Sequence, residues 1–291
     1  MKWNKNFTDR KGRAPSEKKC QALNTSGGYI WGTFSGYPQY SSLCSLGSTC
    51  TESGRLMKWN KKFNYPPSTR SLVMGQRHYD VDNEKLPSVT TILSQTQSEE
   101  KKASLSNWQQ KVGKNEATRI RDQSAERGTI MHRVLEGYLT GHRHADLSDL
   151  GTQAGKMAKT IWEQDLRDNM DEVWGTEVTV YYPGLYAGAT DLVGIYNGTQ
   201  IIGDFKQTNR PKRREWIQDY FLQLAAYGMA HNHVYGTRIQ GGVILMCSPD
   251  LVFQRFFVTP KEYQVLQWEW LKRVDLYYKM KESGVRDQGN L

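Results

Sequence analysis

Cysteine is scarce in this chain of 291 residues, and long apolar runs are absent. The four cysteines form no C-x-x-C pair and have no histidine pair nearby, which argues against a zinc or iron–sulfur site. Free thiols in a reducing compartment are the simplest interpretation. No run of about 18 apolar residues occurs, so we expect no membrane-spanning helix. The basic start of the chain contains Asp9, Pro15 and Glu17 and no apolar signal segment, so we expect neither export nor a transit helix.

Acids are fewer than basic residues, with 30 aspartates and glutamates against 39 lysines and arginines. The net charge of +9 favours a polyanionic partner. The excess is uneven, because residues 1–56 hold eight basic and three acidic residues, a net +5, and leave +4 for residues 57–291. Local clusters therefore carry more information than the total.

Residues 1–56 differ in composition from the rest of the chain. They are rich in glycine, serine and threonine and have few periodic apolar positions, so we expect a poorly ordered leader. The segment Met1–Phe7 recurs almost unchanged as Met57–Phe63. This echo is too short for a repeat architecture, and we hypothesise that Met57 is an ancestral or alternative start. We expect a single domain over residues 57–280 and a polar tail over residues 281–291.

Hydrophobic periodicity predicts a helical part over about residues 100–172, followed by a sheet with its helices over about residues 173–280. Helical spacing begins at Leu105, with Gly113 and Gly128 as expected breaks and a helix from Leu150 to Glu172. Strands are predicted over 72–81, 174–182, 185–196, 200–206, 240–247 and 251–258, and helices over 213–234 and 260–279. Pro183-Gly184 and Asn197-Gly198 are expected hairpin turns. This order indicates an α/β fold with a mixed sheet flanked by helices.

Two charged residues end the apolar strand 200–206. Side chains alternate along a strand, so Asp204 and Lys206 point to the same side, where burial without a role would be costly. A second acid, Asp191, interrupts the preceding apolar strand. Two carboxylates supply the oxygen ligands that Mg²⁺ or Mn²⁺ prefers, and such a metal polarises a phosphodiester and activates bound water. Together with Lys206, which would orient the water or stabilise phosphate charge, they form a candidate site for metal-dependent phosphodiester hydrolysis.

Each of these residues also has a structural interpretation when it is taken alone. Asp191 would then be a buried acid paired with an arginine or with backbone amides. Lys206 would be a strand-end lysine whose ammonium reaches solvent. His132 would be a packed or surface histidine rather than a third ligand, with Glu136 one helical turn away as a secondary candidate.

Other polar and aromatic residues would serve the substrate. Gln223 and Tyr227 share a helix face and would hold a phosphate or base near the metal, unless they only pack against the sheet. A basic cluster directly after the site would track a phosphate backbone, unless it is merely a solvated loop. It comprises Arg210, Lys212, Arg213 and Arg214. Four aromatic residues, Trp108, Trp162, Trp216 and Tyr220, would stack on bases, although such residues at helical spacing more often belong to a core.

Four short motifs, taken in order, resemble the PD-(D/E)XK nuclease superfamily in its RecB-like exonuclease branch. They are Gly128-x-x-x-His132, Gly188-x-x-Asp191, Asp204-x-Lys206 and Gln223-x-x-x-Tyr227. The segment Leu86–Leu93, followed by the Trp108/Val112 helix and by Arg127–His132, looks closer still to the mitochondrial genome maintenance exonuclease group and its phage relatives. The resemblance covers roughly residues 57–280 and implies a restriction-endonuclease-like core with an N-terminal helical portion.

The resemblance also implies roles for individual residues. His132, Asp191 and Asp204 would bind Mg²⁺ or Mn²⁺, with the Phe205 carbonyl nearby, and Lys206 would be the catalytic lysine. Gln223 and Tyr227 would support the site and contact nucleic acid. The cysteine cluster of the iron–sulfur members is absent, and no helicase motif is present.

The expected function is therefore a metal-dependent DNA exonuclease that acts on single-stranded ends or flaps in replication, recombination or repair. We expect it in a bacterial or phage-infected cytoplasm rather than in a mitochondrion, with no membrane partner. Three alternatives stay open: a structure-specific endonuclease of the same fold, a non-catalytic single-stranded DNA-binding protein, and RNA as the substrate. Digestion polarity, processivity and oligomeric state cannot be inferred from the sequence.

Overall fold

The computed structural model describes residues 56–142, 146 and 148–288, together with three short strands. The chain forms two compact units, Met1–Ser45 and Leu46–Leu291. In the first unit, β1 (Ala22–Leu23) pairs with β2 (Tyr29–Ile30) in an antiparallel ladder. The predicted leader lies mostly outside the described residues, so its expected disorder and the alternative start at Met57 stay predictions.

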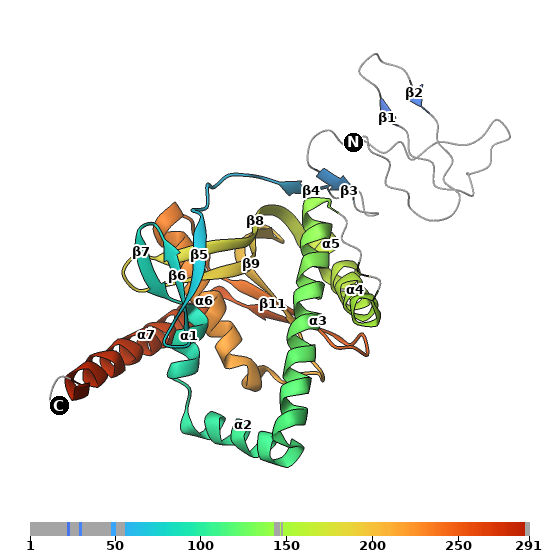
Figure 1. The fold of residues 1–291 in the computed structure, drawn as a ribbon. Coiled ribbons are helices and arrows are strands. Elements are labelled where there is room, and N and C mark those ends of the chain that lie inside the picture. Colours follow the sequence, from blue (N-terminus) through green and yellow to red (C-terminus); the bar gives the residue numbers. More distant parts are fainter. Residues whose placement is uncertain are drawn as a thin grey trace. The chain divides into compact units, whose positions relative to one another are not determined.

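The second unit is built on a mixed sheet of seven strands in the order β12-β11-β10-β9-β8-β4-β3 (Figure 1). These strands are β3 (Ser48–Cys50), β4 (Leu56–Trp59), β8 (Met170–Tyr182), β9 (Tyr186–Tyr196), β10 (Thr199–Gln207), β11 (Gly242–Cys247) and β12 (Phe253–Val258). Strands β8, β9 and β10 are consecutive antiparallel neighbours, whereas β10–β11 and β4–β8 are parallel pairs. The hairpin turns predicted after Tyr182 and Tyr196 are confirmed, and Gly184 and Gly198 have φ values of 73° and 77°, which favour glycine.

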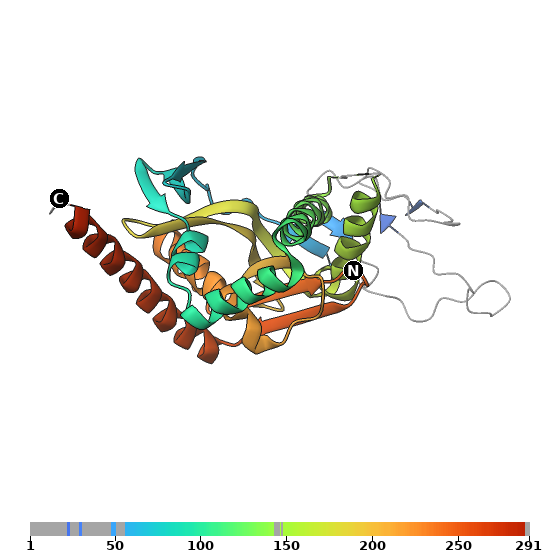
Figure 2. The same cartoon turned by 60° about the horizontal axis from the view of Figure 1, so that its bottom comes forward.

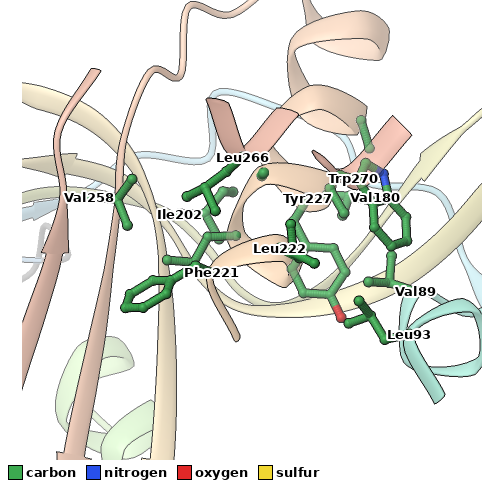
Figure 3. Packing of buried hydrophobic residues seen from close by; sticks show 14 of the residues in the cluster. Val89, Leu93, Val180, Ile202, Phe221, Leu222, Tyr227, Val258, Leu266 and Trp270 are labelled. Atoms are coloured by element: carbon green, nitrogen blue, oxygen red, sulfur yellow. The ribbon is translucent and has the colours of Figure 1, made fainter. Parts of the chain in front are cut away.

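Helices cover both faces of this sheet and bury a separate core on each. On one face, α3 (Lys114–Thr140) and α4 (Asp149–Ile161) pack on Ile201, Phe205 and their neighbours. On the other face, α1 (Val89–Gln95), α6 (Gln218–Tyr235) and α7 (Pro260–Gln288) pack on Ile202 and Val258 (Figure 3). Because side chains alternate along β10, its odd-numbered residues face α3 and α4, and its even-numbered residues face α6. The predicted α/β fold is confirmed, and it is consistent with a restriction-endonuclease-like core.

A small sheet and one exposed helix complete the unit. Strands β5 (Ser68–Val73), β6 (Gln76–Val81) and β7 (Glu84–Pro87) form an antiparallel sheet of three strands. Helix α2 (Glu99–Val112) links α1 to α3 and has no buried residue (Figure 2). Within the described part of the chain, no helix is long and apolar enough to cross a membrane.

Several predicted boundaries are wrong. Gly128 does not break a helix, because α3 runs through it and packs there against Gln207 of β10. The helix predicted to Glu172 ends earlier: a π-helix (Trp162–Leu166) and α5 (Arg167–Asn169) follow α4, and β8 begins at Met170. The strand predicted over 72–81 is split by a turn at Met74 and Gly75. The last helix continues to Gln288, through most of the predicted polar tail.

Candidate active site

Strands β9 and β10 separate at the centre of the sheet. They are paired from Tyr196–Thr199 to Leu192–Gly203, after which β10 continues only with β11, as far as Gln207. At the point of separation the amide N–H of Phe205 donates a hydrogen bond of 2.7 Å to Asp191 Oδ2. The Asp191 carboxylate therefore accepts a hydrogen bond that a backbone carbonyl of the neighbouring strand would accept in a continuous ladder. We call the group Asp191, Asp204, Phe205 and Lys206 the strand fork.

Asp204 and Lys206 form a buried ion pair at this fork. Both follow Ile202 on the α6 side of β10, and Lys206 Nζ donates a hydrogen bond of 2.7 Å to Asp204 Oδ1. Burial alone would lower the pKa of Lys206, but attraction by Asp204 and Asp191 outweighs it and raises the pKa above its ordinary value. The lysine is therefore a fixed cation in the fork.

The second oxygen of Asp204 has no hydrogen bond. The residue is 3% exposed, and although Lys206 Nζ lies 2.7 Å away from Oδ2, no donor among the described residues is aligned with it. Buried carboxylate oxygens normally have hydrogen-bonded partners. Asp204 Oδ2 therefore contacts only the Lys206 ammonium among the described residues, and beside the Asp191 carboxylate it is open to a divalent cation.

His132 is brought to the fork by α3. Its Nε2 donates a hydrogen bond of 2.8 Å to the carbonyl of Phe205, and its Nδ1 lies 3.6 Å from Asp191 Oδ1 and 3.3 Å from Glu177 Oε1. Burial alone would lower the pKa of His132, but the charges of Asp191 and Glu177 overcome it and raise the pKa to about 9. Burial in turn raises the pKa of Asp191 to about 6, against the attraction of His132.

Glu177 is a site residue that the sequence interpretation missed. It lies on β8 with φ 51°, in the left-handed region, and hydrogen bonding to His132 lowers its pKa. Unusual backbone of this kind is concentrated at functional sites. The predicted two-residue turn at Pro183-Gly184 would have paired Tyr182 with Leu185 and placed Glu177 opposite Thr190. The turn in the structure is one residue longer and pairs Tyr182 with Tyr186, and this register brings Glu177 opposite Asp191.

The geometry fits a divalent metal. Ligand atoms of His132, Glu177 and Asp191 all lie within 4.8 Å of one another, and Glu136 is not part of this group. Asp204 Oδ2 is the unsatisfied oxygen at the same fork. Carboxylates are preferred by hard divalent cations, and imidazole by several transition metals. The structure thus brings the predicted His132 and Asp191 together with Glu177. Asp204 is not part of this group but interacts with Asp191 by charge, and the predicted Phe205 carbonyl accepts a hydrogen bond from His132.

Gln223 and Tyr227 lie beneath this site. They are 8% and 4% exposed, and Gln223 Nε2 donates a hydrogen bond of 3.2 Å to Tyr227 Oη. The Tyr227 ring packs against Gly188, where a Cβ would lie 2.5 Å from a ring carbon. Gly188 of the second motif and Tyr227 of the fourth motif are thus in direct contact with each other. Contact of either side chain with nucleic acid stays a prediction.

The basic cluster divides into two kinds of residue. Arg214 is engaged, with hydrogen bonds of 3.2 Å to the Phe257 carbonyl and 2.9 Å to Glu262. Arg210 and Lys212 form no ion pair within the described ranges, and Arg213 has only a long one of 3.9 Å to Glu215. Three of the four predicted cations therefore remain open to a substrate, which stays a prediction.

Comparison with known proteins identifies relatives. The chain is 26% identical to mitochondrial genome maintenance exonuclease 1 of Xenopus tropicalis over 217 residues, which cover 71% of this chain and 61% of that protein. The human protein of the same name is also 26% identical, over 209 residues, with 68% and 60% covered. This chain is related to exonucleases. The match spans about three fifths of the length of these curated relatives.

Other comparisons add little. No protein-family model matches the chain. A crystal structure of a candidate exonuclease from Eubacterium rectale shares 14% identity with a TM-score of 0.38, and the match covers 54% of this chain and 68% of that one.

Proposed function

We propose that this chain is a metal-dependent exonuclease that hydrolyses phosphodiester bonds at single-stranded DNA ends or flaps, in replication, recombination or repair. The observation that carries the proposal is Asp204, a buried acid with an unsatisfied oxygen, held beside the lysine cation of the strand fork. The exonuclease relatives support the same reaction class.

The donor set supports a metal site. Glu177, Asp191, Asp204 Oδ2 and His132 would hold Mg²⁺ or Mn²⁺. When bound, the metal would polarise the phosphodiester and lower the pKa of a bound water. Glu177 and Asp191 would become ligands in place of their present contacts with His132 Nδ1.

Lys206 would act on the substrate directly. Its ammonium is fixed by Asp204 and lies 5.1 Å from the ring centroid of Tyr220, so it has a defined direction. A fixed cation stabilises the negative charge that develops on the phosphate oxygens in the transition state. Asp204 thus has two tasks, to orient the lysine through Oδ1 and to bind the metal through Oδ2.

Charge around the fork supports a nucleic-acid substrate. The open cations Arg210, Lys212 and Arg213 come directly after β10, and α2 carries exposed lysines. One of these, Lys101, forms an ion pair with Asp219 at the start of α6 and so ties α2 to the element that carries Tyr220. Cations on these two segments, the loop after β10 and helix α2, suit the binding of a phosphate backbone.

A digestion assay tests this function. Labelled linear single strands, circular single strands, duplex DNA and RNA are each incubated with Mg²⁺, Mn²⁺ or EDTA. We expect degradation of linear single-stranded DNA with either metal, none in EDTA, and none by Lys206→Ala. Cleavage of the circular strand would identify an endonuclease. Faster digestion of RNA than of DNA would identify RNA as the substrate. Activity that survives in Lys206→Ala would refute the assigned site, and binding without turnover would leave a DNA-binding protein.

A further inference from the structure

Trp216 is an exposed tryptophan held between buried residues. It lies on η2 (Arg214–Ile217), the short helix before α6, and is 58% exposed. The next residue, Ile217, is 4% exposed, and Phe221 is 2% exposed. The backbone is therefore anchored in the core while the indole points outward, an arrangement that burial of apolar surface does not explain.

The support beneath Trp216 is firm. Arg214 bonds to the Phe257 carbonyl and to Glu262, and its guanidinium lies 4.4 Å from the centroid of the Phe221 ring. The preceding loop is held as well, because Gln254 accepts from the Lys212 amide at 2.7 Å and donates to the Lys212 carbonyl at 2.9 Å. Trp216 is thus presented by a fixed platform rather than by a frayed end.

A cation lies against the indole of Trp216. The guanidinium carbon of Arg213 is 5.3 Å from the ring centroid, within the range of a cation–π contact. The only acid near Arg213 in the described part is Glu215 at 3.9 Å, and both side chains are largely exposed, so the arginine keeps most of its charge for another partner. A planar ring beside an uncommitted cation matches a nucleobase with its phosphate.

The position of Trp216 connects it to the strand fork. Tyr220 follows four residues later, and its ring centroid lies 5.1 Å from Lys206 Nζ. Arg210 and Lys212 occupy the chain between the fork and the platform, without ion pairs among the described residues. Open cations and aromatic rings therefore both lie along the chain between Lys206 and Tyr220, the combination found in grooves that bind single strands.

Trp268 shows that exposure alone would not carry this inference. It is 69% exposed on α7, but no cation is stacked on it in the part of the chain that the structure describes. Trp162, another candidate from the sequence, stacks on Tyr138 at 5.3 Å and so already has a ring partner. Trp216 alone among these three combines exposure, a stacked cation and continuity with the fork.

We propose that Trp216, with Arg213, is a base-stacking subsite for single-stranded nucleic acid that leads the strand to Lys206. This inference rests on the proposed function, because it assumes a nucleic-acid substrate, but its test does not need cleavage. The ring would stack on an unpaired base, and Arg213 would bind the adjoining phosphate.

Binding of the full-length chain in EDTA provides the test. Fluorescence anisotropy is measured with a labelled oligothymidylate and with an abasic oligonucleotide of the same length. A stacked base contributes enough that Trp216→Ala should bind the oligothymidylate about 5- to 100-fold more weakly. The abasic oligonucleotide should bind to Trp216→Ala and to the wild type equally well. Trp216→Phe, which keeps a ring, should retain most of the affinity, and Trp268→Ala should bind like the wild type.

The other outcomes overturn the subsite. Unchanged affinity of Trp216→Ala for the oligothymidylate would remove it, and an equal loss for both oligonucleotides would show a role in charge or folding instead of stacking. An equal loss in Trp268→Ala would show that any exposed tryptophan gives the effect. If the stacking effect is found and no metal condition gives cleavage, the subsite stands and the proposed nuclease function fails.

Discussion

The strand fork and the layers around it bury polar groups in different ways. Asp165, outside the fork, is 1% exposed and accepts hydrogen bonds from Tyr196 at 2.8 and 3.0 Å and from Arg255 at 3.1 Å. Asp204, in the fork, is 3% exposed, and its Oδ2 accepts none from the described residues. A buried carboxylate whose oxygens all accept hydrogen bonds, such as Asp165, stabilises the fold. We interpret a buried carboxylate with an oxygen that accepts none, such as Asp204, as a catalytic or metal-binding group. Three pairs of like residues test that distinction.

The two buried aspartates should give opposite phenotypes. Asp204→Asn should lower kcat/KM on single-stranded DNA by about 100- to 1000-fold, because the metal loses a ligand and Lys206 loses its counter-charge. The effect on thermal unfolding should be smaller than the loss of activity, because Asp191 remains as a counter-charge for Lys206 and the repulsion between Asp191 and residue 204 is removed.

Asp165→Asn is the matched control. It should lower the free energy of unfolding by about 1–3 kcal/mol, because the bonds to Tyr196 and Arg255 are weakened in a buried place. Its activity should remain near that of the wild type at temperatures where it is folded. If Asp204→Asn and Asp165→Asn lose activity equally and neither loses stability, the lack of a hydrogen bond on a buried carboxylate does not distinguish a catalytic aspartate from a structural one.

Two glutamates on β8 provide a second comparison. Glu177 lies at the fork, whereas Glu172 accepts hydrogen bonds from Trp174 Nε1 and Asn60 Nδ2. Glu177→Gln should raise the Mn²⁺ concentration needed for half-maximal digestion by about 10- to 100-fold, the usual cost of disturbing a metal centre.

Glu172→Gln separates metal binding from the general effect of changing this strand. Its amide oxygen can still accept from Trp174, so the metal titration should match that of the wild type. A normal Mn²⁺ titration in Glu177→Gln would exclude Glu177 from the metal site and leave only the three ligands predicted from the sequence.

The sequence predicts the fold and the centre of the site because both depend on local pattern. Alternation places Asp204 and Lys206 on one side of β10, and the Asn197-Gly198 turn sets the register of β9 and β10. Glu177 escaped because its place depends on pairing across a hairpin and on an unusual backbone angle. Periodicity could not locate the π-helix before β8 or the passage of α3 through Gly128, since tertiary packing decides both.

The unsatisfied oxygen of Asp204 could not be read from the sequence at all. Whether a buried acid is satisfied depends on every donor that the fold brings within reach. The exposure of Trp216 is similar, because its spacing with Tyr220 fits a core helix face as well as a binding surface. The sequence offered four aromatic candidates, and packing separates Trp162, which stacks on Tyr138, from the exposed Trp108 and Trp216. Of these two exposed rings, only Trp216 has a cation over it among the described residues.

Two histidines provide the third comparison. His132, among the acids of the fork, has its pKa raised to about 9, whereas His231 is fully buried between Tyr65 Oη at 3.1 Å and Thr237 Oγ1 at 2.8 Å. Burial, with a smaller contribution from Lys62, lowers the pKa of His231 to about 4. The same side chain is thus expected to be charged in the fork and neutral in the supporting layer.

Acid should therefore destabilise the fold through His231. The unfolded chain titrates near its ordinary pKa of 6.5 and the folded chain near 4, so between these values the unfolded state binds more protons. The contribution is complete above pH 6.5 and declines as pH falls toward 4.

Between pH 8 and pH 5 the protonation of His231 should lower the free energy of unfolding by about 2 kcal/mol. Urea unfolding of the wild type and of His231→Gln, which lacks this titration, measures the difference. His233→Gln, at an exposed position of the same helix, is the matched control for the substitution itself. If His231→Gln shows the same pH dependence as the wild type, His231 is not held neutral, and the contrast between the fork and its supporting layer would not extend to histidine.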